Sequence, residues 1–142
     1  MLISQVLKEK GDMVFTVSPG DSVAAAAALL HARKVGAMVV LDQRREVAGI
    51  VSERDIVRVV ADQGPDGLAR PVSACMTREV VFADPGETVD QLLGRMTDRR
   101  IRHLPVLKDG KLVGIVSIGD LVKRKIAETE AEAERLKAYI ST

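Results

Sequence analysis

An internal repeat constrains the fold of this chain more than any other feature. The stretch GIVSERDIV at residues 49–57 returns as GIVSIGDLV at residues 114–122, an offset of 65 (114 − 49). Two earlier pairs of stretches also align: VFTVSPGDSV (14–23) with VVFADPGETV (80–89), and KVGAMVVL (34–41) with RIRHLPVL (100–107). Their offset is 66 (80 − 14), so one residue has been gained or lost between Leu41 and Gly49. Self-similarity at a fixed period predicts two copies of one supersecondary unit.

Each copy predicts the same order of elements: strand, helix, strand, strand, helix. A short strand, Val14–Val17 in the first copy and Val80–Phe82 in the second, runs into Pro-Gly and then into an amphipathic helix. The hairpin strands that follow are predicted at Ala37–Leu41 and Glu46–Val51, and at His103–Leu107 and Lys111–Val116. Asp109-Gly110 in the second hairpin suits a tight type I′ turn.

Serine and aspartate stand three residues apart where the last helix of each copy is predicted to begin. Ser52 with Asp55, and Ser117 with Asp120, fit a capping box, in which each side chain satisfies a backbone N–H that the helix leaves free. The pairs are open to two interpretations, helix caps or ligand-binding corners. One aspartate can also serve both roles.

The domain organisation follows the repeat. We expect a first repeat with an N-terminal lead-in at residues 1–68, a second repeat at 69–125 and a helical tail at 126–142. The lead-in ISQVL aligns with VSACM, and a Gly/Pro-rich linker around residues 61–71 joins the copies. The expected fold class is α/β (α+β), with the two repeats packed about a pseudo-two-fold axis and a C-terminal helix. Ligand clefts are expected where the helix N-termini of the two repeats approach each other.

Composition excludes several classes of partner. The 21 Lys and Arg residues nearly cancel the 20 Asp and Glu residues, so neither nucleic acid nor a membrane surface is expected as the main partner. An aromatic content of 2% argues against a platform for stacking bases. No signal peptide is visible, and no stretch approaches the roughly 18 apolar residues of a membrane span. With Cys75 as its lone cysteine, the chain is expected in the reducing cytoplasm.

The residues give little support for catalysis. His31 lies in a predicted helix among alanines, and no serine or cysteine stands in a recognisable nucleophile motif. Cys75 before Met76 is interpreted as a small core residue. No metal-binding cluster or phosphate-cradling Gly-rich loop appears in the sequence. We therefore expect no enzyme, no metal and no catalytic cofactor.

Together these motifs resemble a known family. Two units with G-h-h-[ST]-x-x-D before the last helix (h is apolar), and with h-x-x-h-P-V on the preceding strand, resemble a tandem pair of CBS domains, known as a Bateman module. The likeness covers residues 1 to about 125. It implies a stand-alone, bacterial-type regulatory protein that binds AMP, ADP, ATP, NAD(H) or S-adenosylmethionine and signals through a change in shape or dimer. The choice among these ligands stays open, and so does the alternative of a ligand-free interaction scaffold.

The resemblance also implies roles for particular residues. Asp55 and Asp120 would hold ribose, and Ser52 and Ser117 would lie nearer the phosphate, where a helix N-terminus favours anions. The adenine would lie against the following strand residues: Thr16, Val35, Gly36, Ala37 and Met38 in one copy, and Ala83, Ile101, Arg102, His103, Leu104 and Pro105 in the other.

The copies differ most in charge. Copy two has Arg102-His103 where copy one has Gly36-Ala37, and only copy one carries an arginine, Arg54, two residues after its serine. Because a guanidinium matches phosphate with a planar fork of donors, we hypothesise that Arg54, Arg102 and His103 converge on phosphate and that the sites are unequal. The alternatives are that both arginines are solvated surface residues and that His103 is packed or bonded to backbone.

The tail predicts a further helix. Residues 121–140 contain no Gly or Pro and are rich in helix-forming residues. A seam with spacings of 4, 3, 4, 3 and 4 is formed by Val122, Ile126, Thr129, Ala133, Leu136 and Ile140. We expect this seam to pack on its own module or on a second subunit, and we expect a homodimer. The alternative is a frayed, solvated tail, and the regulated partner protein is not visible in the chain.

Overall fold

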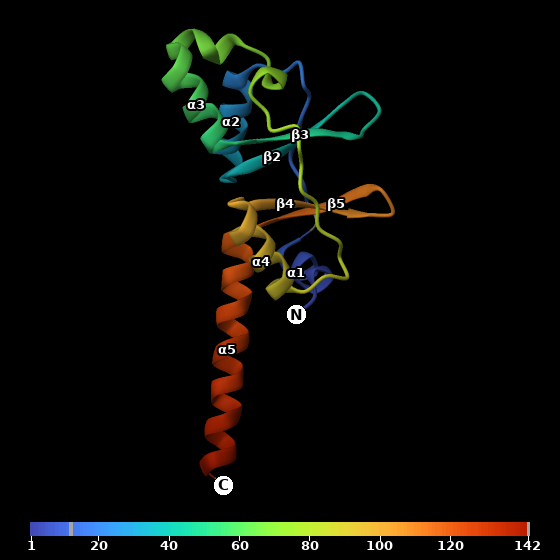
Figure 1. Ribbon diagram of the computed structural model, residues 1–142, viewed down its shortest axis with the longest axis vertical. Coiled ribbons are helices and arrows are strands. Elements are labelled where there is room, and N and C mark those ends of the chain that lie inside the picture. Colours follow the sequence, from blue (N-terminus) through green and yellow to red (C-terminus); the bar gives the residue numbers. More distant parts are fainter. Residues whose placement is uncertain (12, 142) are drawn as a thin grey trace. The chain divides into compact units, whose positions relative to one another are not determined.

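The chain forms two compact units, each of which contains one repeat. The computed structural model describes residues 1–11 and 13–141, so Asp12 of the predicted first repeat and Thr142 of the predicted tail lie outside the described residues (Figure 1). The repeat-one unit comprises Met13–Val81. The repeat-two unit comprises Phe82–Thr142 together with Met1–Asp12. The α/β fold class predicted from the sequence is confirmed.

The repeat-one unit packs helices against a small mixed sheet. Its sheet order is β1-β2-β3, with β1 parallel to β2 and β2 antiparallel to β3. Its elements are β1 (Thr16–Val17), α2 (Val23–Arg33), β2 (Ala37–Leu41), β3 (Val47–Ser52), α3 (Glu53–Gln63) and the 3₁₀ turns η1 (Gly64–Ala69) and η2 (Val72–Ala74). The core is mainly aliphatic and includes a cluster of Val17, Ala26, Leu30, Met38, Val40, Val51, Val72 and Met76. The linker predicted around residues 61–71 is therefore largely ordered, as the end of α3 and the turn η1.

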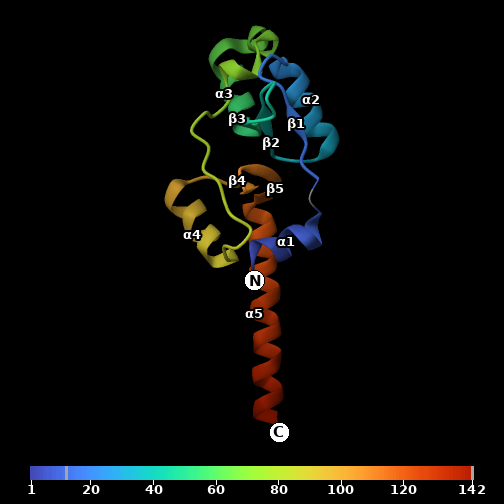
Figure 2. The same ribbon diagram turned by 90° about the vertical axis from the view of Figure 1, so that its right-hand side faces the viewer.

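The repeat-two unit has the same order of helix, hairpin and helix, with the N-terminal helix added and a longer last helix. Its elements are α1 (Ile3–Lys10), α4 (Val89–Arg99), β4 (His103–Lys108), β5 (Lys111–Ser117) and α5 (Ile118–Ser141). Strands β4 and β5 form an antiparallel hairpin. The last helix of the repeat and the predicted tail are one continuous helix, α5, which Figure 2 shows end to end.

The one-residue difference between the copies lies in the hairpin turn. In the repeat-two unit, Asp109 and Gly110 have φ angles of 52° and 76°, as a type I′ turn requires. In the repeat-one unit the turn is longer: the N–H of Asp42 donates to the carbonyl of Glu46, and Arg45 has a φ of 62°. Both hairpins predicted from the sequence are confirmed, with ends that differ by a residue.

The strand predicted at Val80–Phe82 does not form, and that prediction is wrong. Only Ala83 makes a parallel bridge there, to Val106. In the other unit the equivalent ladder extends to Thr16, which pairs with Val39. Pro105 stands at the position of Val39 and has no N–H to donate, so the ladder cannot be extended by one more residue.

Each unit is completed by a segment from outside its own repeat in the sequence. The N–H of Val72 donates to the carbonyl of Asp21 at 2.7 Å, which holds the segment after the linker against the start of α2. In the same way, the N–H of Ile3 donates to the carbonyl of Glu87 at 2.9 Å, which holds α1 against the start of α4. The predicted boundaries placed the lead-in with the first repeat, whereas α1 lies in the repeat-two unit.

The glycine of the repeated motif makes room for these segments. A Cβ on Gly49 would lie 2.7 Å from the carbonyl oxygen of Thr77 and 2.8 Å from the sulfur of Met76. A Cβ on Gly114 would lie 2.6 Å from a terminal methyl of Leu7. Contacts this close force a shift in the neighbouring atoms, of backbone at Gly49 and of the end of a flexible side chain at Gly114, so glycine fits best where the incoming segment crosses the hairpin.

Alanine substitutions at the two motif glycines should lower the free energy of unfolding by different amounts. We predict that Gly49→Ala lowers the free energy of unfolding by about 2 kcal/mol or more, because backbone must move away from the new methyl. Gly114→Ala should cost less, about 1 kcal/mol, since only the end of the Leu7 side chain has to shift. Gly94 in α4 has nothing within 4 Å of its Cβ position, so Gly94→Ala should stabilise by about 0.5–1 kcal/mol. Urea unfolding of the three variants measures this order, and an equal or larger cost at Gly114 contradicts it.

Candidate functional site

In the repeat-one unit, the strand-to-helix corner holds a buried and fully engaged aspartate. One carboxylate oxygen of Asp55 accepts from the N–H of Ser52 at 2.9 Å and from its hydroxyl at 3.1 Å. The Ser52 hydroxyl in turn accepts from the N–H of Asp55 at 3.4 Å. The other carboxylate oxygen contacts the guanidinium of Arg58 at 3.3 Å. The capping box predicted here is therefore confirmed.

In the repeat-two unit, the same corner recruits a cation from α1. One carboxylate oxygen of Asp120 accepts from the N–H of Ser117 at 2.8 Å and from the ammonium of Lys10 at 2.5 Å. The N–H of Asp120 donates back to the Ser117 hydroxyl at 3.1 Å, which completes the cap. Lys10 also donates to the carbonyl of Ile115 at 2.7 Å. Residues 110 positions apart thus meet at one carboxylate.

Burial and hydrogen bonding act in opposite directions on the pKa of this second aspartate. Burial alone would raise the pKa of Asp120, but the hydrogen bonds from Lys10 and Ser117 outweigh it and hold the pKa below its ordinary value. The carboxylate is therefore ionised at neutral pH and accepts hydrogen bonds only.

The two aspartates differ in access to solvent. Asp55 is 4% exposed, whereas the side chain of Asp120 is 27% exposed. A carboxylate offers about four acceptor positions. At Asp120 the hydrogen bonds from Lys10 and from the N–H of Ser117 reach the same oxygen, so its second oxygen can take the hydroxyls of a diol. The corner of the repeat-two unit is the better placed of the two to hold a sugar.

The start of the hairpin lies beside the corner in each unit. In the repeat-one unit the N–H of Glu53 donates to the carbonyl of Gly36 at 3.0 Å, and Ala37 pairs with Ser52. In the repeat-two unit the N–H of Ile118 donates to the carbonyl of Arg102 at 2.8 Å, and His103 pairs with Ser117. The two sets of predicted residues are therefore each brought together within a unit.

The remaining predicted residues divide by exposure. Met38, Ala83, Leu104 and Pro105 are buried, Val35 is partly buried, and Thr16 is exposed. Arg54 and Arg102 are exposed, and His103 is partly buried. The convergence of Arg54 with Arg102 and His103 involves both units and stays a prediction.

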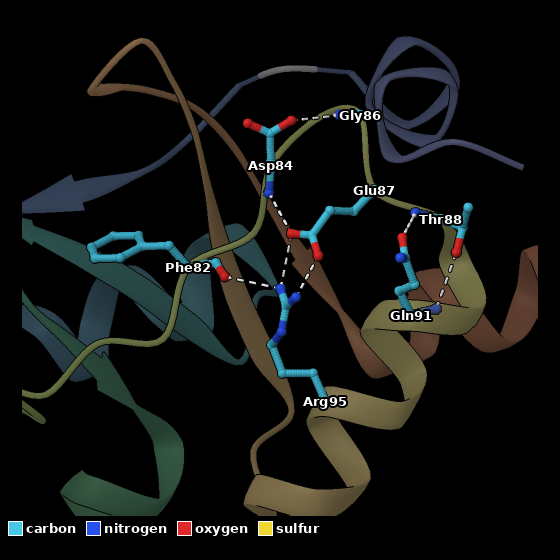
Figure 3. A network of polar contacts seen from close by, with 7 residues as sticks. All are labelled: Phe82, Asp84, Gly86, Glu87, Thr88, Gln91 and Arg95. Carbon is cyan, nitrogen blue, oxygen red and sulfur yellow. Dashed lines mark hydrogen bonds and ion pairs between the residues drawn. The ribbon is translucent and has the colours of Figure 1, made fainter.

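Sequence reasoning missed a polar network at the start of α4. Figure 3 shows the guanidinium of Arg95 paired through both terminal nitrogens with the carboxylate of Glu87, and donating to the carbonyl of Phe82 at 3.1 Å. The hydrogen bonds from Arg95 lower the pKa of Glu87 against the opposing effect of burial. The first copy has Asp21 and Leu29 at these positions. This paired difference between the copies was the signal available in the sequence.

The lone cysteine lacks the setting of a reactive thiol. Burial, reinforced by the negative charge of Asp55, raises the pKa of the Cys75 thiol, although Arg58 opposes this. A raised pKa reduces the thiolate fraction at neutral pH. Cys75 packs against the core of the repeat-one unit, as the sequence predicted.

The Lys10–Asp120 pair should make stability depend on pH. Because the pKa of Asp120 is lowered on folding, its contribution is fully present above the unfolded pKa of about 3.9 and is lost as the pH falls through the folded value. We predict that Lys10→Met lowers the free energy of unfolding by about 1 kcal/mol at pH 7 and weakens this loss in acid. Lys8→Met on the same helix is the matched control and should change it by less than about 0.5 kcal/mol. Urea unfolding at pH 7 and near pH 3 tests this, and equal effects of the two variants contradict it.

No helix among the described residues has the length and apolar character needed to cross a bilayer.

Comparison with known proteins places this fold in a family. The sequence model of the CBS domain matches residues 11–62 and 72–126. The mitochondrial CBS domain-containing protein CBSX3 of Arabidopsis thaliana is 37% identical, over 97% of this chain and 71% of that protein.

Solved structures agree with this match. The CBS-domain containing protein ATU1752 from Agrobacterium tumefaciens is 47% identical with a TM-score of 0.85, over 87% of this chain and 92% of that one. The CBS domain pair of protein MJ0100, solved in complex with 5′-methylthioadenosine and S-adenosyl-L-methionine, is 25% identical with a TM-score of 0.77, over 87% of this chain and 98% of that one. The chain therefore belongs to the CBS domain family and carries two CBS repeats.

Proposed function

We propose that this protein is a regulatory module that binds an adenosine compound and transmits its level through a change of shape or assembly. The observation that carries the proposal is the corner of the repeat-two unit, where an ionised and partly exposed Asp120 lies at a helix start beside the ammonium of Lys10. The adenosine compounds in the MJ0100 complex support the ligand class. AMP, ADP, ATP, NAD(H) and S-adenosylmethionine are the candidate ligands.

The proposed role of Asp120 is to accept the ribose hydroxyls. A carboxylate accepts both O–H groups of a diol, and charge-assisted hydrogen bonds of this kind are stronger than neutral ones. Adenine would lie along the start of β4, where Leu104 and Pro105 are buried. In the other unit, the equivalent contacts with adenine would come from Thr16, Val35 and the Gly36–Met38 stretch.

The proposed role of the cations is to bind phosphate. At each corner the N–H groups of the serine, of the residue after it and of the aspartate are already satisfied. A phosphate must therefore find most of its donors in side chains, and Arg102 is exposed beside the repeat-two corner. We propose Arg102 and His103, with Arg54 of the other repeat, as these donors, and Ser52 and Ser117 as hydroxyl contacts.

The burial of Asp55 favours a second function for the repeat-one corner. At 4% exposure, and with both oxygens engaged by Ser52 and Arg58, this carboxylate acts as a structural cap. If the same holds at Asp120, the protein is a ligand-free scaffold for a partner protein.

Conservative amide substitutions should distinguish the two corners. Saturating adenosine ligand should raise the melting temperature by several degrees, since ligand at about 100 times its Kd adds roughly 2.7 kcal/mol. We predict that Asp120→Asn abolishes this shift and that Asp55→Asn keeps it, because only Asp120 is accessible. Thermal unfolding with AMP, ADP, ATP, NAD⁺, NADH, S-adenosylmethionine and 5′-methylthioadenosine measures it. The absence of any shift supports the scaffold, and loss of the shift only in Asp55→Asn reverses the assignment of the corners.

Comparing AMP with adenosine should isolate the phosphate contacts. We predict that Arg102→Ala weakens AMP binding by about ten- to a hundredfold, the loss of one charge-assisted contact, and leaves adenosine binding unchanged. Arg54→Ala should act in the same direction, whereas Arg99→Ala, at another exposed arginine, is the control. Isothermal titration calorimetry measures the affinities of the wild type and of each variant for both ligands. Equal losses for AMP and adenosine would assign Arg102 a structural role instead.

A further inference from the structure

The described residues in the second half of α5 lie away from the core of their own unit. Up to Glu128 the helix is anchored: Leu121 is buried, Arg124 pairs with Glu9 at 2.5 Å, and Glu128 pairs with the N-terminal ammonium of Met1 at 2.9 Å. Every described residue from 129 to 141 is exposed. Figures 1 and 2 both show this part of the helix running clear of the other elements of its unit.

This exposed segment carries large apolar side chains. Ile126 is 53% exposed, Leu136 is 56% exposed and Ile140 is 81% exposed. A helical segment as short as residues 129–141 is only marginally stable by itself in water, and most helices gain their stability by burying an apolar face. The segment therefore has an apolar face that a partner helix would cover.

The apolar residues form a heptad seam on a side of the helix that is free. Positions a and d are occupied by Val122, Ile126, Thr129, Ala133, Leu136 and Ile140. At 100° per residue, this seam is centred roughly 120° around the helix from the anchored side with Leu121 and Glu128. A second helix can thus pack on the seam without displacing α5 from its unit.

The charges beside the seam select the partner and its direction. In a parallel pair of these helices, Lys125 faces Glu130 of the partner subunit, and Glu132 faces Lys137 of the partner subunit. Both pairs join opposite charges. An antiparallel pair with the seams fully overlapped would instead place Glu132 against its own copy, and Glu130 against its own copy. We propose that two copies of this chain associate in parallel through α5 as a short coiled coil.

This association rests on α5 alone and stands whether or not an adenosine compound binds. Lys125 already contacts Asp90 of its own unit at 3.0 Å, so changing Lys125 would also remove that contact. The pair of Glu132 with Lys137 is therefore the better one to substitute. The contact of Lys137 with Glu134 within the helix is long, at 3.6 Å, and highly exposed, so it competes little.

Charge reversal tests the pairing. Sedimentation velocity of the full chain at several concentrations should give a dimer of about 30.6 kDa, twice 15.3 kDa. Glu132→Lys or Lys137→Glu alone should weaken dimerisation roughly tenfold, because each creates two like-charge pairs. An equimolar mixture of the two variants should dimerise as well as the wild type, since both interfacial pairs are again opposite in charge. A monomeric wild type, or a dimer unaffected by either variant, overturns the proposal.

Disulfide formation tests the direction independently. In a Cys75→Ala background, Ala133→Cys at an a position should form a cross-linked dimer on oxidation, since a positions meet in a parallel pair. Ala131→Cys, on the opposite side of the same helix, is the matched control and should stay monomeric on a non-reducing gel. Cross-linking at 131 but not at 133, or equally at both, overturns the parallel arrangement. Both sites are exposed, so circular dichroism should show that each variant keeps the fold.

Discussion

Each compact unit depends on close contact between a hairpin glycine and a segment that is distant in the sequence. Gly49 lets the segment around Met76 and Thr77 cross the first hairpin, and Gly114 lets Leu7 of α1 cross the second. Backbone hydrogen bonds then fix the first segment against the start of α2 and the second against the start of α4. Because neither repeat is complete without this segment, the glycine of the motif is a packing requirement as much as the serine and aspartate are helix caps.

Local features of the fold could be predicted from the sequence because local chemistry determines them. The hairpin turn at Asp109-Gly110 and the cap of α3 each depend on residues within four positions of one another. The contact of Lys10 with Asp120 spans 110 positions, and no periodicity encodes it. The absence of a strand before Ala83 could have been predicted from the sequence, since Pro105 has no N–H to donate to the ladder.

The serine–aspartate motif lies in a different environment in each unit. At the first corner Asp55 is buried against Arg58, and its carboxylate stabilises the helix start. At the second corner α1 supplies Lys10, and Asp120 stays ionised and partly open to solvent. The copies also differ in the charge of the adjoining strand, where Arg102 replaces Gly36. A duplicated unit can in this way keep its fold while one copy has the features of the proposed adenosine-binding corner.

Binding of an adenosine compound at the repeat-two corner can be followed residue by residue in a titration of the ¹⁵N-labelled protein with AMP. We expect the largest shifts of the amide resonances on residues 102–104 and 117–120, with the amide of Gly119 among them. Shifts confined to other parts of the chain, or no shifts at all, would contradict it.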